Sequence, residues 1–262
     1  MTLPDIQQIN QIAREAGKAI LNVYAQDFEV QEKADSSPLT QADMASHRLI
    51  EAALKQFTPD IPVLSEESAK IPYAERRQWN RYWLIDPLDG TREFVKRNGE
   101  FTVNIALIDK DGPVLGVVHV PVTGITYFGD VEAGAFRQEG NSPPEQIHVT
   151  RPCASPMRVA GSRSHAGDSL VRFLQKLPAH EMVSMGSSLK LCLVAEGKAD
   201  IYPRLGPTSE WDTAAAQAVV EAAGGQVTDT DLQRLRYNQK ESLLNPYFLV
   251  FGDSSIDWKA YL

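Results

Sequence analysis

The most informative stretch of the sequence is Trp83-Leu84-Ile85-Asp86-Pro87-Leu88-Asp89-Gly90-Thr91, where an apolar run ends in two carboxylates. The apolar residues before Asp86 predict a buried strand. Pro87 holds Asp86 in an extended conformation, so the chain leaves the strand without entering a helix at once. Gly90 tightens the turn that follows, and in such a turn Asp86 and Asp89 can face one point. Converging carboxylates repel unless a hard cation lies between them, and a ligand set of oxygens alone favours Mg²⁺.

Other acidic residues also stand at the ends of predicted elements. Glu66 and Glu67 directly follow a predicted strand at 61–64, and Asp212 lies at the start of a predicted helix at 211–223. Strand ends and helix starts are the places where α/β folds assemble their sites. Thr91 opens a short segment whose free backbone N–H groups can hold a phosphate oxygen.

Taken singly, each of these features has an ordinary explanation. The Asp, Pro and Gly residues of the stretch 86–90 are turn formers, the pair at 66–67 is typical of a solvated surface, and Asp212 suits the positive end of a helix dipole. Their combination, with each acid at an element end, favours a metal and phosphate site.

The pattern of elements around these acids divides the chain in two. Helices are predicted at 4–24 and from Thr40 onward, where Thr40 and Asp43 have the spacing of a helix N-terminus. Strands follow at 61–64, 82–85, 101–108, 114–120, 125–128 and 134–137. This order indicates an α+β unit, and we expect it to span residues 1–155 and to carry most of the metal ligands.

A Pro- and Gly-rich stretch at 140–156 is the candidate linker to the second unit. Beyond it, strands alternate with helices, which indicates an α/β unit over residues 156–262. The predicted strands are 158–160, 182–185, 199–202 and 248–251, and the predicted helices are 168–177, 187–196 and 211–223.

The composition is that of a globular chain: 262 residues, 43% hydrophobic and 23% charged. The net charge of −8 argues against DNA or RNA as a partner, since phosphate neutralisation needs a basic face. Cys153 and Cys192 have no metal-binding or disulfide spacing, so we expect them to take no part in the chemistry. No leader peptide or integral membrane segment is visible, and we expect a cytoplasmic protein.

Three motifs together carry a resemblance to a known family. They are, in chain order, Ser65-Glu66-Glu67-Ser68, the stretch from Trp83 to Thr91, and Trp211-Asp212-Thr213-Ala214-Ala215. In this order they resemble the motifs of the inositol monophosphatase-like superfamily of metal-dependent phosphatases. The resemblance implies a sandwich of alternating α/β/α/β/α layers. It also implies more than one Mg²⁺ ion, held by Glu66, Asp86, Asp89, Asp212 and the backbone carbonyl of Leu88. Catalysis then falls to Glu66 and to Thr91 paired with Asp43, which orient and deprotonate a water.

Further segments resemble one subgroup of that superfamily, the 3′(2′),5′-bisphosphate nucleotidases of the CysQ type. These are residues 96–104, Gly161-Ser162-Arg163-Ser164-His165 and Gly186-Ser187-Ser188-Leu189-Lys190. By resemblance, the substrate-binding residues are Glu66, Leu88, Asp89, Gly90, Thr91, Ser162, His165, Gly186, Lys190 and Asp212. From the residues alone, His165 can equally be a surface histidine, Lys190 a solvated lysine, and 187–188 a simple helix cap.

The resemblance implies an Mg²⁺-dependent phosphatase that converts adenosine 3′,5′-bisphosphate to AMP and phosphate. It also implies activity on 3′-phosphoadenylyl sulfate, a role in sulfur assimilation and nucleotide recycling, and inhibition by Li⁺. It leaves peripheral association with the inner membrane open. The alternatives are an inositol or sugar phosphatase with the same metals, a nucleotide sensor without catalysis, and a structural domain whose acids only solvate strand ends.

Overall fold

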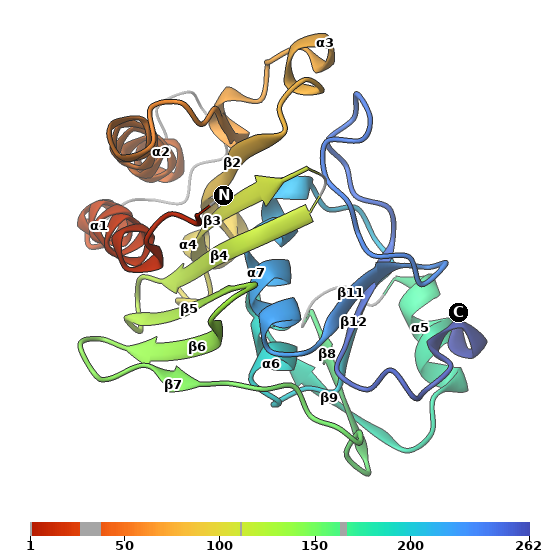
Figure 1. Ribbon diagram of the computed structural model, residues 1–262. Helices are drawn as coiled ribbons and strands as arrows, with labels where there is room; N and C mark the ends of the chain where they lie inside the picture. The colour runs from red at the N-terminus through yellow and green to blue at the C-terminus, as the bar shows by residue number, and fades with distance from the viewer. Residues whose placement is uncertain (1, 27–37, 111, 163–166) are drawn as a thin grey trace.

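The computed structural model describes residues 2–26, 38–110, 112–162 and 167–262, which form alternating layers of helix and sheet (Figure 1). Helices α1 (Ile6–Tyr24) and α2 (Pro38–Phe57) cover the outer face of a seven-stranded sheet. Helices α6 (Leu189–Ala195) and α7 (Glu210–Ala222) separate that sheet from a five-stranded one. Helix α5 (Asp168–Lys176) packs on the far side of the second sheet. The expected α/β/α/β/α sandwich is confirmed.

The first sheet keeps its strands in chain order, and only its first pair is parallel. Its strands are β1 (Val63–Ser65), β2 (Arg81–Asp89), β3 (Thr102–Asp109), β4 (Gly112–Val120), β5 (Ile125–Asp130), β6 (Gly134–Glu139) and β7 (Glu145–Gln146). Three short helical turns border it: η1 (Glu66–Ser68), α3 (Tyr73–Arg76) and α4 (Thr91–Val95).

The second sheet has the order β11-β12-β10-β8-β9. Its strands are β8 (Met157–Gly161), β9 (His180–Ser184), β10 (Ile201–Arg204), β11 (Gln226–Asp229) and β12 (Phe248–Phe251), and the chain closes with η2 (Trp258–Tyr261). Strand β11 pairs with β12 and lies in a stretch that the sequence pattern had not assigned.

Three local predictions need correction. Strand β2 continues through Asp89, where a turn was expected, because β3 pairs with Asp86 and again with Asp89 across an irregularity between them. Helix α2 begins at Pro38, which suits a first helical turn, so Thr40 lies inside the helix rather than at its cap. The candidate linker contains β7, which pairs with β6.

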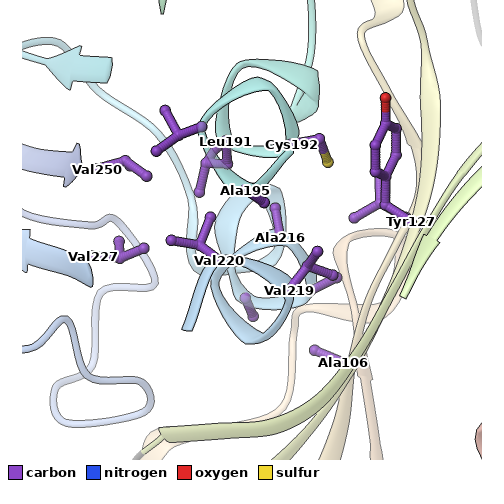
Figure 2. Close-up of a cluster of buried hydrophobic side chains, with 14 of the residues drawn as sticks. Ala106, Tyr127, Leu191, Cys192, Ala195, Ala216, Val219, Val220, Val227 and Val250 are labelled. Carbon is purple, nitrogen blue, oxygen red and sulfur yellow. The ribbon is translucent and has the colours of Figure 1, made fainter. Parts of the chain in front are cut away.

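Helix α7 joins the two sheets into one core (Figure 2). Ala216, Val219 and Val220 of this helix lie between Ala106 of the first sheet and Val250 of the second, and all five side chains are buried. Small side chains let the backbones approach: a Cβ at Gly116 of β4 would collide with the carbonyl oxygen of Ala215. This close packing fixes the start of α7, and with it Asp212, against the first sheet.

Candidate active site

Three aspartates from two distant parts of the chain converge beside the first sheet. Asp86 and Asp89 lie on β2, and Asp212 is in the first turn of α7. One carboxylate oxygen from each lies within 4.8 Å of the others. A capping box orients Asp212, whose Oδ2 accepts a hydrogen bond of 2.9 Å from the backbone N–H of Ser209.

The carboxylates of this cluster are buried close together, so their ionised forms need a cation as a partner. Asp86 is 1% exposed, and burial raises its pKa well above the ordinary value, with further increases from Asp89, Glu66, Asp212 and Asp43. Burial, and then the charge of Asp89, raises the pKa of Asp212 to about 7. Several buried carboxylates that disfavour each other's ionisation are stabilised by a cation between them. Because every ligand atom is an oxygen, the site fits Mg²⁺.

Glu66 and Leu88 flank this cluster. Glu66 begins η1 directly after β1, and β1 runs parallel to β2 with Ser65 beside Ile85. Its charge acts on both Asp86 and Asp212. Leu88 is fully buried between the two aspartates of β2, and its backbone N–H donates to Asp86 Oδ1 at 3.1 Å.

Thr91 and Asp43 approach the cluster from two other elements. Thr91 begins α4 directly after Gly90, which has φ +94°, and a Cβ there would lie 3.1 Å from the Glu100 carbonyl oxygen. Only glycine meets both conditions without strain. Asp43 lies on α2, is 8% exposed, and raises the pKa of Asp86.

A cavity of about 430 Å³ opens beside the acid cluster. The cavity is lined by most of the substrate-binding residues predicted from the sequence: Asp89, Gly90, Thr91, Ser162, Gly186, Lys190 and Asp212. Glu66 and Leu88 are not among its described lining residues. His165 lies outside the described residues.

Lys190 forms part of the cavity wall and is largely buried. It is 7% exposed, and its Nζ donates to the carbonyl oxygens of Ser187 at 2.6 Å and Met185 at 3.3 Å. Burial lowers its pKa to about 8, so the ammonium is mostly charged at neutral pH. Lys190 therefore holds the loop at 185–188 and also places positive charge beside the cavity.

Several lining residues were missed by the sequence reasoning. Arg204 stands at the end of β10, and its charge lowers the pKa values of both Lys190 and Asp212. Arg92, Tyr202 and Thr208 also line the cavity. Arg204 could have been found by the same rule that found the acids, since it is a charged residue at a strand end, whereas the other three carry no such signal.

Both cysteines are free thiols, Cys192 buried in α6 and Cys153 half-buried. Neither is among the described residues that line the cavity. Within the described ranges, every helix is too short or too polar to cross a membrane.

Comparison with known proteins agrees with this geometry. Residues 4–251 match the model of the inositol monophosphatase family, and the chain belongs to that family. The curated "3′(2′),5′-bisphosphate nucleotidase CysQ" of Salmonella typhimurium is 52% identical over 247 residues, covering 94% of this chain and 98% of that protein. The protein of the same name from Haemophilus influenzae is 38% identical over 256 residues, covering 97% and 95%.

Two solved structures show the same fold. CysQ from Bacteroides thetaiotaomicron, described as a bacterial member of the inositol monophosphatase family, has a TM-score of 0.84 and 42% identity, with 94% of this chain and 97% of that chain covered. An inositol monophosphatase from Zymomonas mobilis has a TM-score of 0.80 at 24% identity, with 98% and 96% covered.

Proposed function

We propose that this protein is an Mg²⁺-dependent phosphatase that removes the 3′-phosphate of adenosine 3′,5′-bisphosphate to give AMP and phosphate. The observation that carries the proposal is the cluster of Asp86, Asp89 and Asp212 at the edge of a cavity whose wall also carries Lys190 and Arg204. The cluster suits a cation, and the wall suits a second anionic group on the same ligand. The 52% identity to a curated bisphosphate nucleotidase over most of both chains supports the same substrate.

The metal ligands in this proposal are Glu66, Asp86, Asp89, Asp212 and the backbone carbonyl of Leu88. Bound Mg²⁺ would neutralise phosphate charge and lower the pKa of a bound water. The chain's own contribution is to fix these oxygens on β2, η1 and α7. The N–H of Leu88, 3.1 Å from Asp86 Oδ1, holds that carboxylate on the strand.

Glu66, Thr91 and Asp43 are assigned to the attacking water. In this assignment the water would give a proton to the Thr91 hydroxyl as Thr91 passes its own proton to the Asp43 carboxylate, and Glu66 would orient the water for in-line attack. The burial of Asp43 on α2 and its effect on the pKa of Asp86 support this place beside the metal site. No covalent enzyme intermediate is required.

The second phosphate is assigned to the wall formed by Lys190, Ser162 and Gly186. The resemblance of residues 161–165 to the nucleotidase segment assigns His165 to the same phosphate. A buried ammonium strengthens its interaction with an anion, because little water competes for either charge. A ligand with an anionic group at the 5′ position is therefore favoured over a monophosphate. On the same ground we extend the proposal to 3′-phosphoadenylyl sulfate and to a role in sulfur assimilation and nucleotide recycling.

The site draws on both halves of the chain. We retain residues 1–155 and 156–262 as subdomains, the first with most metal ligands and the second with Asp212 and the nucleotide wall. A nucleotide substrate and two free cysteines favour action in the cytoplasm.

The experiment that tests this function measures phosphate release from adenosine 3′,5′-bisphosphate and from inositol 1-phosphate, each with Mg²⁺ and with EDTA. We expect Mg²⁺-dependent, multiple-turnover release, much faster from the nucleotide. A preference for inositol 1-phosphate would retain the metal site and overturn the assignment of the wall. No release from either substrate would reject catalysis and favour a nucleotide sensor.

A further inference from the structure

One oxygen of the Asp89 carboxylate is occupied by donors from the segment just before α6. Asp89 Oδ2 accepts hydrogen bonds of 2.5 Å from the Ser187 hydroxyl and 2.5 Å from the backbone N–H of Ser188. The Thr102 hydroxyl lies 3.5 Å from the same oxygen. Because these donors saturate Oδ2, the other oxygen, Oδ1, is the one that remains for a cation.

These donors belong to a buried network of hydroxyl and amide groups. Thr102 Oγ1 lies 2.7 Å from Ser187 Oγ and 2.9 Å from Ser188 Oγ, and Ser188 Oγ donates to Asn104 Oδ1 at 3.0 Å. Thr102, Asn104 and Ser188 are 0%, 1% and 3% exposed. Water therefore cannot replace the bonds among Thr102, Asn104 and Ser188 without a structural change.

The direction of each bond follows from chemistry. A carboxylate and an amide oxygen only accept, so the Ser187 proton goes to Asp89 and the Ser188 proton goes to Asn104. The Thr102 hydroxyl has one proton, so it donates to one of the two serine hydroxyls at a time. Removal of the Thr102 hydroxyl takes away this donor and loosens the serine hydroxyls, including the Ser187 hydroxyl that holds Asp89.

The network connects the strands of the acid cluster to the cavity loop. On β3, Thr102 lies opposite Asp89 of β2, and Asn104 lies opposite Asp86. The same loop is held from its other side by Lys190 Nζ, which donates to the Ser187 carbonyl oxygen at 2.6 Å. The orientation of Asp89 and the position of the cavity wall are thus set by one set of bonds.

We propose that Thr102, Ser188 and Asn104 are positioning residues that fix Asp89 through Ser187 and so preform the cation site. The inference rests on the proposed function only for the identity of the cation, Mg²⁺. A carboxylate held in its binding orientation loses little conformational freedom when the metal binds. Loss of such outer contacts typically costs about 10–100-fold in metal affinity or activity.

The test compares Thr102→Val, which replaces the hydroxyl by a methyl of similar size, with Thr102→Ser, which restores the hydroxyl. Thr126→Val is the matched control, because Thr126 is also 0% exposed and its hydroxyl bonds His119 Nδ1 at 2.9 Å, on strands β5 and β4. The readout is the Mg²⁺ dissociation constant, measured by calorimetry without substrate, beside the melting temperature of each variant in EDTA.

We expect Thr102→Val to bind Mg²⁺ about 10-fold more weakly. Thr102→Ser should recover most of that affinity, and Thr126→Val should stay within about twofold of wild type. Equal Mg²⁺ affinity in all three folded variants would overturn the inference while leaving the proposed function intact. If Thr102→Val does not fold, Ser188→Ala takes its place, with the same expected weakening and the same contradictory result. Weakened Mg²⁺ binding in an enzyme that prefers inositol 1-phosphate would confirm the network and reject the nucleotide assignment.

Discussion

Replacement of Asp89 by asparagine separates the metal role of this residue from its structural role. Its carboxylate lies within 4.8 Å of oxygens from Asp86 and Asp212. Fully ionised carboxylates at that distance repel by about 3 kcal/mol at an effective dielectric constant of about 20, and the raised pKa values of Asp86 and Asp212 make the repulsion in the metal-free protein smaller than this. The variant relieves this repulsion. In return, the two hydrogen bonds from Ser187 and Ser188 no longer have a charged acceptor, and each stabilises the fold by about 1 kcal/mol less. The metal-free variant should therefore be at least as stable as the wild type.

When Mg²⁺ is present, the wild type should be the more stable of the two proteins. At a concentration about 100-fold above its dissociation constant, Mg²⁺ stabilises the wild type by about 2.7 kcal/mol. Asp89→Asn should gain almost none of this and should lose turnover. Urea unfolding in EDTA and in Mg²⁺ gives both free energies of unfolding, and phosphate release gives the activity.

Asp130→Asn is the matched control for this measurement. Asp130 Oδ1 accepts bonds of 2.8 Å and 2.7 Å from the backbone N–H groups of Glu132 and Ala133 at the end of β5. This variant should lose about 1–2 kcal/mol in EDTA and in Mg²⁺ alike, and it should keep the Mg²⁺ increment. A folded Asp89→Asn protein with wild-type turnover, or with the full Mg²⁺ increment, would refute the assignment of Asp89.

Three further predictions address the wall, the pH dependence and the metals. Lys190→Met should raise KM for adenosine 3′,5′-bisphosphate far more than KM for a nucleoside monophosphate, and equal effects in steady-state kinetics would reject its role. Burial lowers the pKa of His119 from 6.5 to about 4. As the pH falls below 6.5, the imidazole therefore takes up a proton in the unfolded chain before it does so in the folded protein. The folded state loses stability between pH 6.5 and pH 4 as a result. Between pH 6.5 and pH 4, the free energy of unfolding of His119→Gln should fall by about 3 kcal/mol less than that of the wild type. A variant with the same pH profile as the wild type would count against this prediction. Li⁺ should inhibit turnover, and inhibition that Mg²⁺ does not modify would exclude competition at a metal site.

The sequence predicted the parts of this molecule that depend on local chemistry. Residues 248–251 are apolar throughout and form β12 as expected. Asp89 at the end of β2 and Asp212 in the first turn of α7 meet as expected for acids at element ends, whereas Asp86 joins them from inside β2.

Features of the structure that depend on contacts between distant segments could not be predicted from the local sequence. Pro87 and Gly90 favour a turn locally, yet β2 runs through Asp89 because β3 pairs with it. Thr102 carries no local sign of function, since the serines it contacts are 85 and 86 positions away. Arg204 reaches the cavity only because β10 lies at the centre of the second sheet.

If the acid cluster holds the catalytic metal, Mn²⁺ should bind there as well, because it takes similar oxygen ligands. The decisive measurement is an anomalous difference map from crystals soaked in Mn²⁺. We expect density bonded to carboxylate oxygens of Asp86, Asp89 and Asp212. Mn²⁺ density that avoids these three residues, in crystals of an enzyme that Mn²⁺ activates, would contradict this expectation.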